Sequence, residues 1–139
     1  MSDLHTFRQT RLQQLFTAFN RHDSGAVMAC MTDDVIFDAA AGPEICGRRI
    51  SGAIEVRAVF ERTFADMPDA SWQCTRHAVF GNRALSEWIF RATTKDGTRV
   101  EAQGCDLFLF SGDKICAKSA FRKDRPLQPA AQPMDTARS

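Results

Sequence analysis

The feature that most constrains the fold is a change of hydrophobic period near residue 71. From there to residue 122, apolar and polar residues alternate in strand-length runs separated by short turn sequences. The turns at Gly81–Asn82, Asp96–Gly97 and Ser111–Asp113 are typical of β-hairpins, because their residues tolerate the backbone of tight turns. The pattern therefore predicts a meander of four strands, over Trp72–Phe80, Ala84–Thr94, Thr98–Phe110 and Lys114–Arg122.

The first part of the chain has a helical period instead. Apolar residues recur every three or four positions, with arginine and glutamine between them, which predicts a helix over Asp3–Asn20. A second, shorter helix is predicted over Gly25–Met31, because Asp23 and Ser24 both have side chains that cap helix N-termini. Both helices are expected to turn one apolar face toward a common core.

The region between this part and the meander is predicted to hold a strand, a loop and a third helix. The short strand is Val35–Asp38, and the glycine-containing loop is Ala39–Ile50. The third helix is predicted to be capped by Ser51 and to end before Pro68. Three helices followed by four strands predict an α+β domain, in which a curved antiparallel sheet packs on the helices and leaves an interior for a ligand.

One domain is expected to account for most of the chain. A length of 139 residues suits a single core, and we place this domain at residues 1–123. The remaining segment, 124–139, contains Pro126, Pro129 and Pro133 among small and polar residues. We predict a flexible C-terminal tail there, because the segment offers little apolar surface to bury.

Charge and composition argue against several classes of function. The formal net charge is +1 and both signs are interspersed, so no basic surface for nucleic acid or membrane lipids is indicated. The N-terminus lacks an apolar signal core, and no segment approaches the roughly 20 apolar residues of a membrane span. The five cysteines show neither zinc-site nor CxxC spacing. We therefore expect a cytoplasmic protein with free thiols and no metal site.

Two aspartates lie within apolar runs. Asp38 follows Val35–Phe37 and precedes three alanines, and Asp106 lies between Cys105 and Leu107. A carboxylate is costly to remove from water, so such a residue either points outward by strand alternation or faces a pocket.

The register of the meander bears on Asp106. If Asp96–Gly97 is a two-residue turn, Glu87 lies opposite Asp106 on the same face of the sheet. The other face is then the more apolar, which favours an exposed Asp106. That apolar face is expected to be buried in a homodimer, and it carries Trp88, Phe90 and Leu107.

The last strand leaves two registers open. A two-residue turn at Gly112–Asp113 places Ser119 on the face of Asp106. A three-residue loop with a bulge places Lys118 and Arg122 there instead, and gives Asp106 a cationic neighbour.

The order of the elements and several motifs resemble the SnoaL-like branch of the nuclear-transport-factor-2-like superfamily. The resemblance covers residues 7–124, and its motifs are Ala18–Asp23, Met31–Asp38, Gly47–Arg49, Gly104–Phe108 and Lys114–Ile115. It implies a cone-shaped, cystatin-like α+β fold that is often dimeric through the open face of its sheet. The superfamily includes ketosteroid isomerases, SnoaL-type polyketide cyclases, epoxide hydrolases and non-catalytic binding modules.

The resemblance also implies roles for the two aspartates. Asp38 stands where the isomerases have their catalytic base, because the pattern Asp-Asp-x-x-x-Asp is shared, and Asp106 stands where they have an oxyanion-hole aspartic acid. In the cyclases, one strand aspartate serves as acid and base, and Asp106 is the candidate for that role.

Two functions are predicted as alternatives. The first is a cofactor-independent isomerase or cyclase, in which Asp38 and Asp106 transfer protons on a small apolar carbonyl substrate. The second is a non-catalytic ligand-binding or dimerisation module; it is favoured because the chain contains no tyrosine, whereas the isomerases use a tyrosine hydroxyl. The residues expected to line the pocket are Phe16, Phe60, Phe64, Glu87, Phe108 and Arg122.

Overall fold

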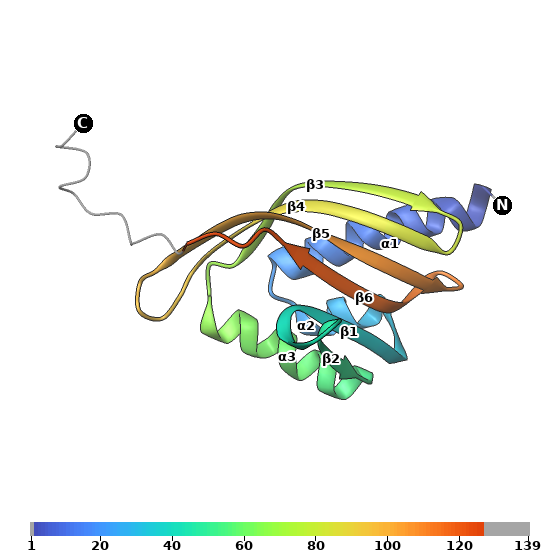
Figure 1. Ribbon diagram of the computed structural model, residues 1–139. Helices are drawn as coiled ribbons and strands as arrows, with labels where there is room; N and C mark the ends of the chain where they lie inside the picture. The colour runs from blue at the N-terminus through green and yellow to red at the C-terminus, as the bar shows by residue number, and fades with distance from the viewer. Residues whose placement is uncertain (1, 127–139) are drawn as a thin grey trace.

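The computed structural model of the chain describes residues 2–126 and shows three helices packed against one six-stranded, curved sheet (Figure 1). The helices are α1 (Ser2–Asn20), α2 (Ser24–Ala29) and α3 (Ala53–Asp66). The strands are β1 (Met31–Glu44), β2 (Gly47–Ser51), β3 (Ser71–Phe80), β4 (Arg83–Thr93), β5 (Arg99–Ser111) and β6 (Lys114–Arg122). The predicted α+β class and the four strands of the meander are confirmed.

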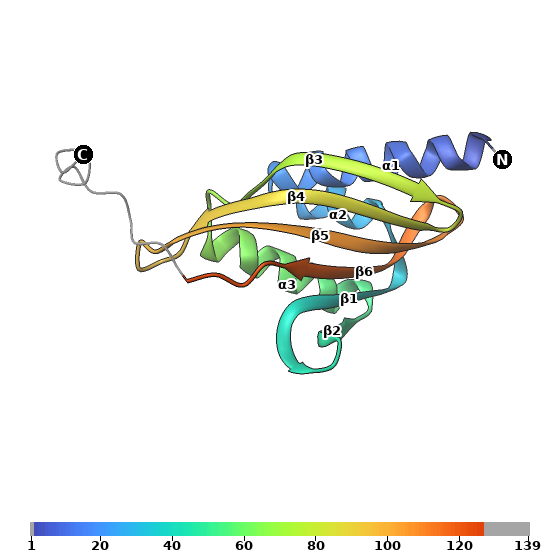
Figure 2. The ribbon, with the colours of Figure 1, turned by 45° about the horizontal axis from the view of Figure 1, so that its top comes forward.

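The strands lie in the order β2-β1-β6-β5-β4-β3. All neighbours are antiparallel except β1 and β6, which run parallel. Figure 2 shows the helices on one side of the sheet and the other side open. We call these sides the helix-covered face, which carries Trp88, Asp106 and Lys118, and the open face, which carries Glu87 and Leu107.

The core lies between the helices and the helix-covered face. In the second half of α1, apolar residues at helical spacing are buried, and they are Leu12, Leu15, Phe16 and Phe19, whereas Leu4 and Phe7 near its start are exposed. They meet Val56 and Phe60 of α3 and Phe108 of β5 in one cluster. The helical period in the sequence therefore located the buried stripe of α1.

The predicted loop Ala39–Ile50 is wrong, because most of this segment forms strands. β1 continues to Glu44, and a bulged hairpin joins it to β2. Gly47 has a φ of 86°, and a Cβ atom on it would lie 2.0 Å from the carbonyl oxygen of Ala39. The glycine thus permits a close approach within the hairpin, which is why it resembled a loop signal in the sequence.

The boundaries of the helices differ in two places from the prediction. The second helix ends at Ala29, because Met31 already belongs to β1; Asp23 caps its start by accepting a hydrogen bond from the N–H of Ala26 at 3.0 Å. The predicted cap at Ser51 is wrong, since Gly52 occupies the N-cap of α3 and no side chain caps this helix.

The predicted register between β4 and β5 is wrong by one residue. Thr94 donates its N–H to the carbonyl of Thr98, so that the turn has three residues and Asp106 lies opposite Ser86. A slip of one residue reverses which side chains share a face. Asp106 is therefore fully buried toward the helices rather than exposed, and 45% of Leu107 is exposed on the open face.

This register also separates the residues that were expected to form one dimer face. Trp88 and Phe90 lie on the helix-covered face and are 5% and 4% exposed. Leu107 lies on the opposite face.

A bulge settles the register of the last strand. Ser111 pairs with Lys114 across a two-residue turn, but the pairing then shifts at Cys116. Lys118 consequently lies opposite Phe108 and on the face of Asp106. The structure thus combines the short turn of one alternative with the facing residues of the other.

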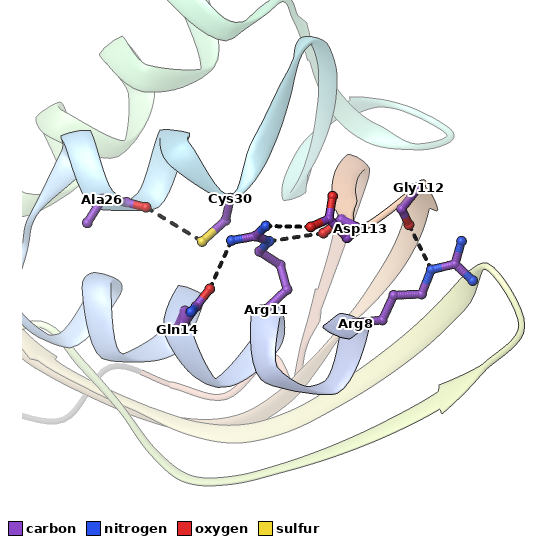
Figure 3. A network of polar contacts seen from close by, with 7 residues as sticks. All are labelled: Arg8, Arg11, Gln14, Ala26, Cys30, Gly112 and Asp113. Atoms are coloured by element: carbon purple, nitrogen blue, oxygen red, sulfur yellow. Dashed lines mark hydrogen bonds and ion pairs between the residues drawn. The ribbon is translucent and has the colours of Figure 1, made fainter. Parts of the chain in front are cut away.

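Two arginines of α1 fasten this helix to the turns of the sheet (Figure 3). Arg8 is buried and donates to the carbonyl oxygens of Gly112 at 2.8 Å and Gly81 at 2.7 Å, one in each of two hairpin turns. Arg11, one helical turn later, forms an ion pair with Asp113 at 2.9 Å. One guanidinium therefore holds together segments more than 70 residues from it in the sequence.

We expect Arg8→Met to lower the free energy of unfolding by about 2 kcal/mol, because it removes two charge-assisted hydrogen bonds to backbone carbonyls. Urea denaturation followed by circular dichroism measures this loss. Arg11→Met is the matched control and should cost less than about 1 kcal/mol, since Asp113 is half-exposed. Equal losses in the two variants would contradict the special role of Arg8.

Candidate functional site

A pocket of about 960 Å³ lies over β3 to β6, with Ala40 of β1 contributing to its wall. It borders the bulge of β3, where Cys74 adopts a φ of 57° and the pairing with β4 shifts. Its lining includes Arg76, Glu87, Trp88, Phe121, Arg122 and Lys123. We call this site the β3–β6 pocket.

A glycine determines the position of one aromatic wall. A Cβ atom on Gly104 would lie 2.4 Å from Cη2 of Trp88 and 2.4 Å from the carbonyl oxygen of Phe121. The indole ring therefore lies directly over a backbone position that has no side chain. Its Nε1 donates to Oδ2 of Asp106 at 2.9 Å. Trp88 thus connects the pocket to the buried carboxylate.

Asp106 belongs to a buried ion pair. Its Oδ1 accepts from the ammonium of Lys118 at 3.0 Å, and the two side chains are 0% and 6% exposed. The ammonium also lies 4.7 Å from the ring centroid of Phe37 and within 6 Å of Phe19 and Phe60. Aromatic faces stabilise a cation that has lost its water, so these three rings compensate part of the desolvation cost of the Lys118 ammonium.

A second polar pair lies beside this one on the helix-covered face. Ser86 is fully buried directly opposite Asp106, and its Oγ lies 2.8 Å from Nδ1 of His77. Burial lowers the pKa of His77. The register therefore aligns polar side chains from β3, β4 and β5 under the pocket.

Asp38 lies apart from this group. It pairs with Ser119 of β6, which lies opposite Leu107, and so it belongs to the open face. Arg49 binds it through two hydrogen bonds of 2.9 Å. The structure does not bring Asp38 and Asp106 together, because the sheet itself separates their side chains.

The guanidinium of Arg49 holds the pKa of Asp38 below its ordinary value of 3.8. We expect the carboxyl carbon of Asp38 to titrate below 3.8 by NMR, and Arg49→Met to return it toward that value. Because the folded-state pKa is lowered, the pair stabilises the fold above the unfolded-state pKa, and this contribution is lost as the pH falls through the folded-state value.

Arg48→Met is the matched control for this titration, since it removes the neighbouring cation on β2 and leaves Asp38 paired. An ordinary titration of Asp38 in the wild-type protein would contradict the ion pair.

The residues predicted to line a pocket divide into two groups. Four of them are buried in the core, and they are Phe16, Phe60, Phe64 and Phe108. The ring centroids of Phe16 and Phe108 lie 6.4 Å apart, and the ring of Phe19 contacts those of Phe60 and Phe64. Glu87 and Arg122 do line the β3–β6 pocket.

Among the pocket residues named above, five were not predicted from the sequence in these roles: Arg76, Trp88, Gly104, Phe121 and Lys123. Gly104 carried the only available signal, because a glycine inside a strand often marks a close approach.

Neither a metal centre nor a membrane span is evident within residues 2–126. In that range, no three His, Cys, Asp or Glu side chains gather as a metal site would require. Each helix there is too short or too polar to cross a bilayer. The predicted tail lies mostly outside the described residues, which end at Pro126.

Comparisons with known proteins agree with this architecture. A family model described as a SnoaL-like domain matches residues 12–118. A "putative polyketide cyclase" from Xanthomonas campestris is 18% identical with a TM-score of 0.77, over 86% of this chain and 93% of that one. No curated protein sequence matches the chain.

Two further solved structures have a similar fold. A protein of unknown function with a cystatin-like fold, also from Xanthomonas campestris, is 15% identical with a TM-score of 0.75, over 84% of this chain and 91% of that one. A hypothetical protein from Catenulispora acidiphila with a ketosteroid isomerase-like fold, in complex with trimethylamine, is 15% identical with a TM-score of 0.71 over 80% and 83%. The predicted cystatin-like fold is confirmed.

Proposed function

Because this chain belongs to the SnoaL-like family, we propose that it binds a small organic molecule in the β3–β6 pocket. The observation that carries the proposal is the pocket itself, whose volume of about 960 Å³ lies in the range of small-molecule sites. Its lining combines the exposed ring of Phe121 with a few charged groups, which suits a largely apolar molecule with a polar end.

The contacts of the aspartates favour binding over proton transfer. Both carboxylate oxygens of Asp106 already accept hydrogen bonds, from Trp88 and Lys118. Asp38 is bound by Arg49 on the other face. We therefore assign Asp106 the role of a positioning residue that holds the indole of Trp88 against the pocket.

A cofactor-independent isomerase or cyclase is the second candidate. It is supported by the fully buried carboxylate of Asp106, one hydrogen bond away from a pocket residue. In such a reaction, an acidic C–H beside the substrate carbonyl would replace the indole N–H at Oδ2 of Asp106. The carboxylate would take up that proton and return it to another atom of the same substrate.

A fluorescence titration tests the binding proposal. In a Trp72→Phe variant, Trp88 is the remaining tryptophan. Addition of planar carbonyl compounds should change its emission saturably and shift the NMR signals of Phe121 and Cys105. The control is Trp88→Phe, whose remaining Trp72 packs on Phe19 in the core and should not respond. Saturable binding that shifts only residues outside the pocket would contradict the proposal.

Asp106→Asn separates the two candidates. If the protein only binds its ligand, the folded variant should bind with the affinity of the wild-type protein. Neither protein should then turn the ligand over. If it is an isomerase or cyclase, turnover of a bound carbonyl compound should disappear in Asp106→Asn while binding remains.

We also propose that a second copy of the chain covers the open face. Two large apolar side chains outside the β3–β6 pocket are exposed there, and they are Phe80 and Leu107. Light scattering at micromolar concentration should give a dimer, and Leu107→Glu should weaken it. Ile54→Glu on α3 changes a more exposed apolar residue outside the open face and should leave the dimer unchanged. A strictly monomeric wild-type protein would contradict this proposal.

The five free thiols support a reducing, cytoplasmic location.

A further inference from the structure

The β3–β6 pocket lies on the open face of the sheet. Four of its side chains form one row across four strands, in which each residue lies directly opposite the next: Arg76, Glu87, Cys105 and Phe121. Directly opposed residues share a face, so the whole row lies on the side of Glu87. None of the four side chains is buried, and 52% of Phe121 is exposed.

The neighbouring row of the pocket contributes its floor. The side chains of Trp88 and Arg122 lie on the helix-covered face, and Gly104 between them has none, so this row meets the pocket mainly through its backbone. Small-molecule sites bury roughly 70–90% of their ligand, whereas one side of a sheet contacts only one side of a molecule. The pocket of a single copy is therefore incomplete.

An apolar surface adjoins the pocket on the same face. Leu107 is two residues from Cys105 along β5, a separation of about 7 Å, and 45% of it is exposed. Leu85 lies opposite Leu107 on β4, and Leu109 follows on the same face of β5. Phe80 is 56% exposed at the end of β3. A body that packs on this surface also extends over the pocket, because the two are neighbours on one face.

The charges of the open face suit a second copy of the chain. Three ion pairs there each join a cation to a carboxylate of the same copy: Arg76 with Glu87 at 3.1 Å, Arg91 with Glu101 at 2.7 Å, and Arg49 with Asp38 at 2.9 Å. Much of the charge is thus neutralised before any partner arrives. Two such faces can approach each other with little repulsion, whereas a highly charged partner would find few unmatched charges.

We propose that a second copy of the chain closes the β3–β6 pocket, so that the ligand is held between the open faces of two copies. The proposal rests on the proposed binding function and on the proposed dimer, and it adds that the two are linked. A ligand that contacts both copies stabilises the dimer. By thermodynamic linkage, the dimer then binds the ligand more tightly than the monomer does, by the same factor.

The wild-type protein tests this linkage with 2-acetylnaphthalene, a planar carbonyl compound. Sedimentation velocity measures the dissociation constant of the dimer without the probe and with a saturating amount of it. The NMR signals of Cys105 and Phe121 report the affinity for the probe at protein concentrations below and above that constant. We expect the probe to lower the dissociation constant of the dimer about tenfold, a typical size for coupling between two binding events.

Variants outside the pocket test the linkage from the other side. Leu107→Glu and Phe80→Glu both place a carboxylate on the open face without changing a pocket residue. At a concentration where the wild-type protein is dimeric, each should reduce the affinity for the probe about tenfold, and a higher protein concentration should restore it. Ile54→Glu makes the same kind of change on α3 and should preserve both the dimer and the affinity. Unchanged circular dichroism spectra would establish that the variants fold.

The outcomes separate this inference from the proposals on which it rests. If the wild-type protein dimerises and the probe binds both Glu variants of the open face as tightly as the wild-type protein, the shared site is wrong and the binding function stands. Tighter binding to these variants would also overturn it, because ligand and partner would then compete. A wild-type protein that binds the probe in the pocket as a strict monomer would refute the dimer together with the shared site. If the probe shifts no pocket signal at millimolar concentration, the binding function fails as well.

Discussion

Lys118→Met is expected to lower the free energy of unfolding by about 3–5 kcal/mol, because it leaves the carboxylate of Asp106 without a counter-charge in a site closed to water. The effect arises from the lost partner more than from the lost methylene packing, since methionine fills a similar volume among the rings of Phe19, Phe37 and Phe60. Urea denaturation measures the loss.

Two further variants test this explanation. Adding Asp106→Leu to Lys118→Met removes the orphaned charge, so the double variant should be more stable than Lys118→Met alone. Lys95→Met breaks an ion pair with Asp66 that is exposed on both sides, and it should cost less than about 1 kcal/mol. A loss of that small size in Lys118→Met would show that water reaches the pair.

Gly104→Ala should destabilise the protein by about 2–3 kcal/mol and displace Trp88. The added methyl group would meet the backbone oxygen of Phe121 and the indole ring, both at 2.4 Å, and the backbone oxygen cannot move aside alone. The NMR signal of the indole N–H should shift as its hydrogen bond to Asp106 lengthens, and ligand affinity at the pocket should fall.

Gly25→Ala is the matched control for this substitution. Its added methyl group would meet only Asp23, at an ordinary contact distance of 3.6 Å, and α2 should gain slightly in stability because alanine is the better helix former. An unmoved indole signal in Gly104→Ala would contradict the position given to Trp88.

Local patterns in the sequence identified most of the elements. The helical period located α1 and its buried stripe from Leu12 to Phe19, and the turn residues separated the four strands from β3 to β6. These features depend on residues within a few positions of one another, so they are visible without the rest of the fold. The family resemblance added the cystatin-like fold, which the comparisons confirm.

Local sequence patterns predicted only part of the candidate site. The sequence singled out Asp106, Glu87 and Arg122, and the structure places Glu87 and Arg122 at one pocket with Asp106 beneath it. The separation of Asp38 from Asp106 could not be foreseen, because the strands that carry them meet only through β6.

What the sequence by itself determined, therefore, is the class of fold, the order of its elements and the residues with unusual chemistry. The tertiary structure alone decided which side of the sheet each of them faces. One extra residue in the turn before Thr98 and one bulge at Cys116 turned Asp106 inward and placed Lys118 beside it. Side chains alternate with a period of two, so each such shift exchanges the faces of a strand, and packing over the whole sheet selects the register.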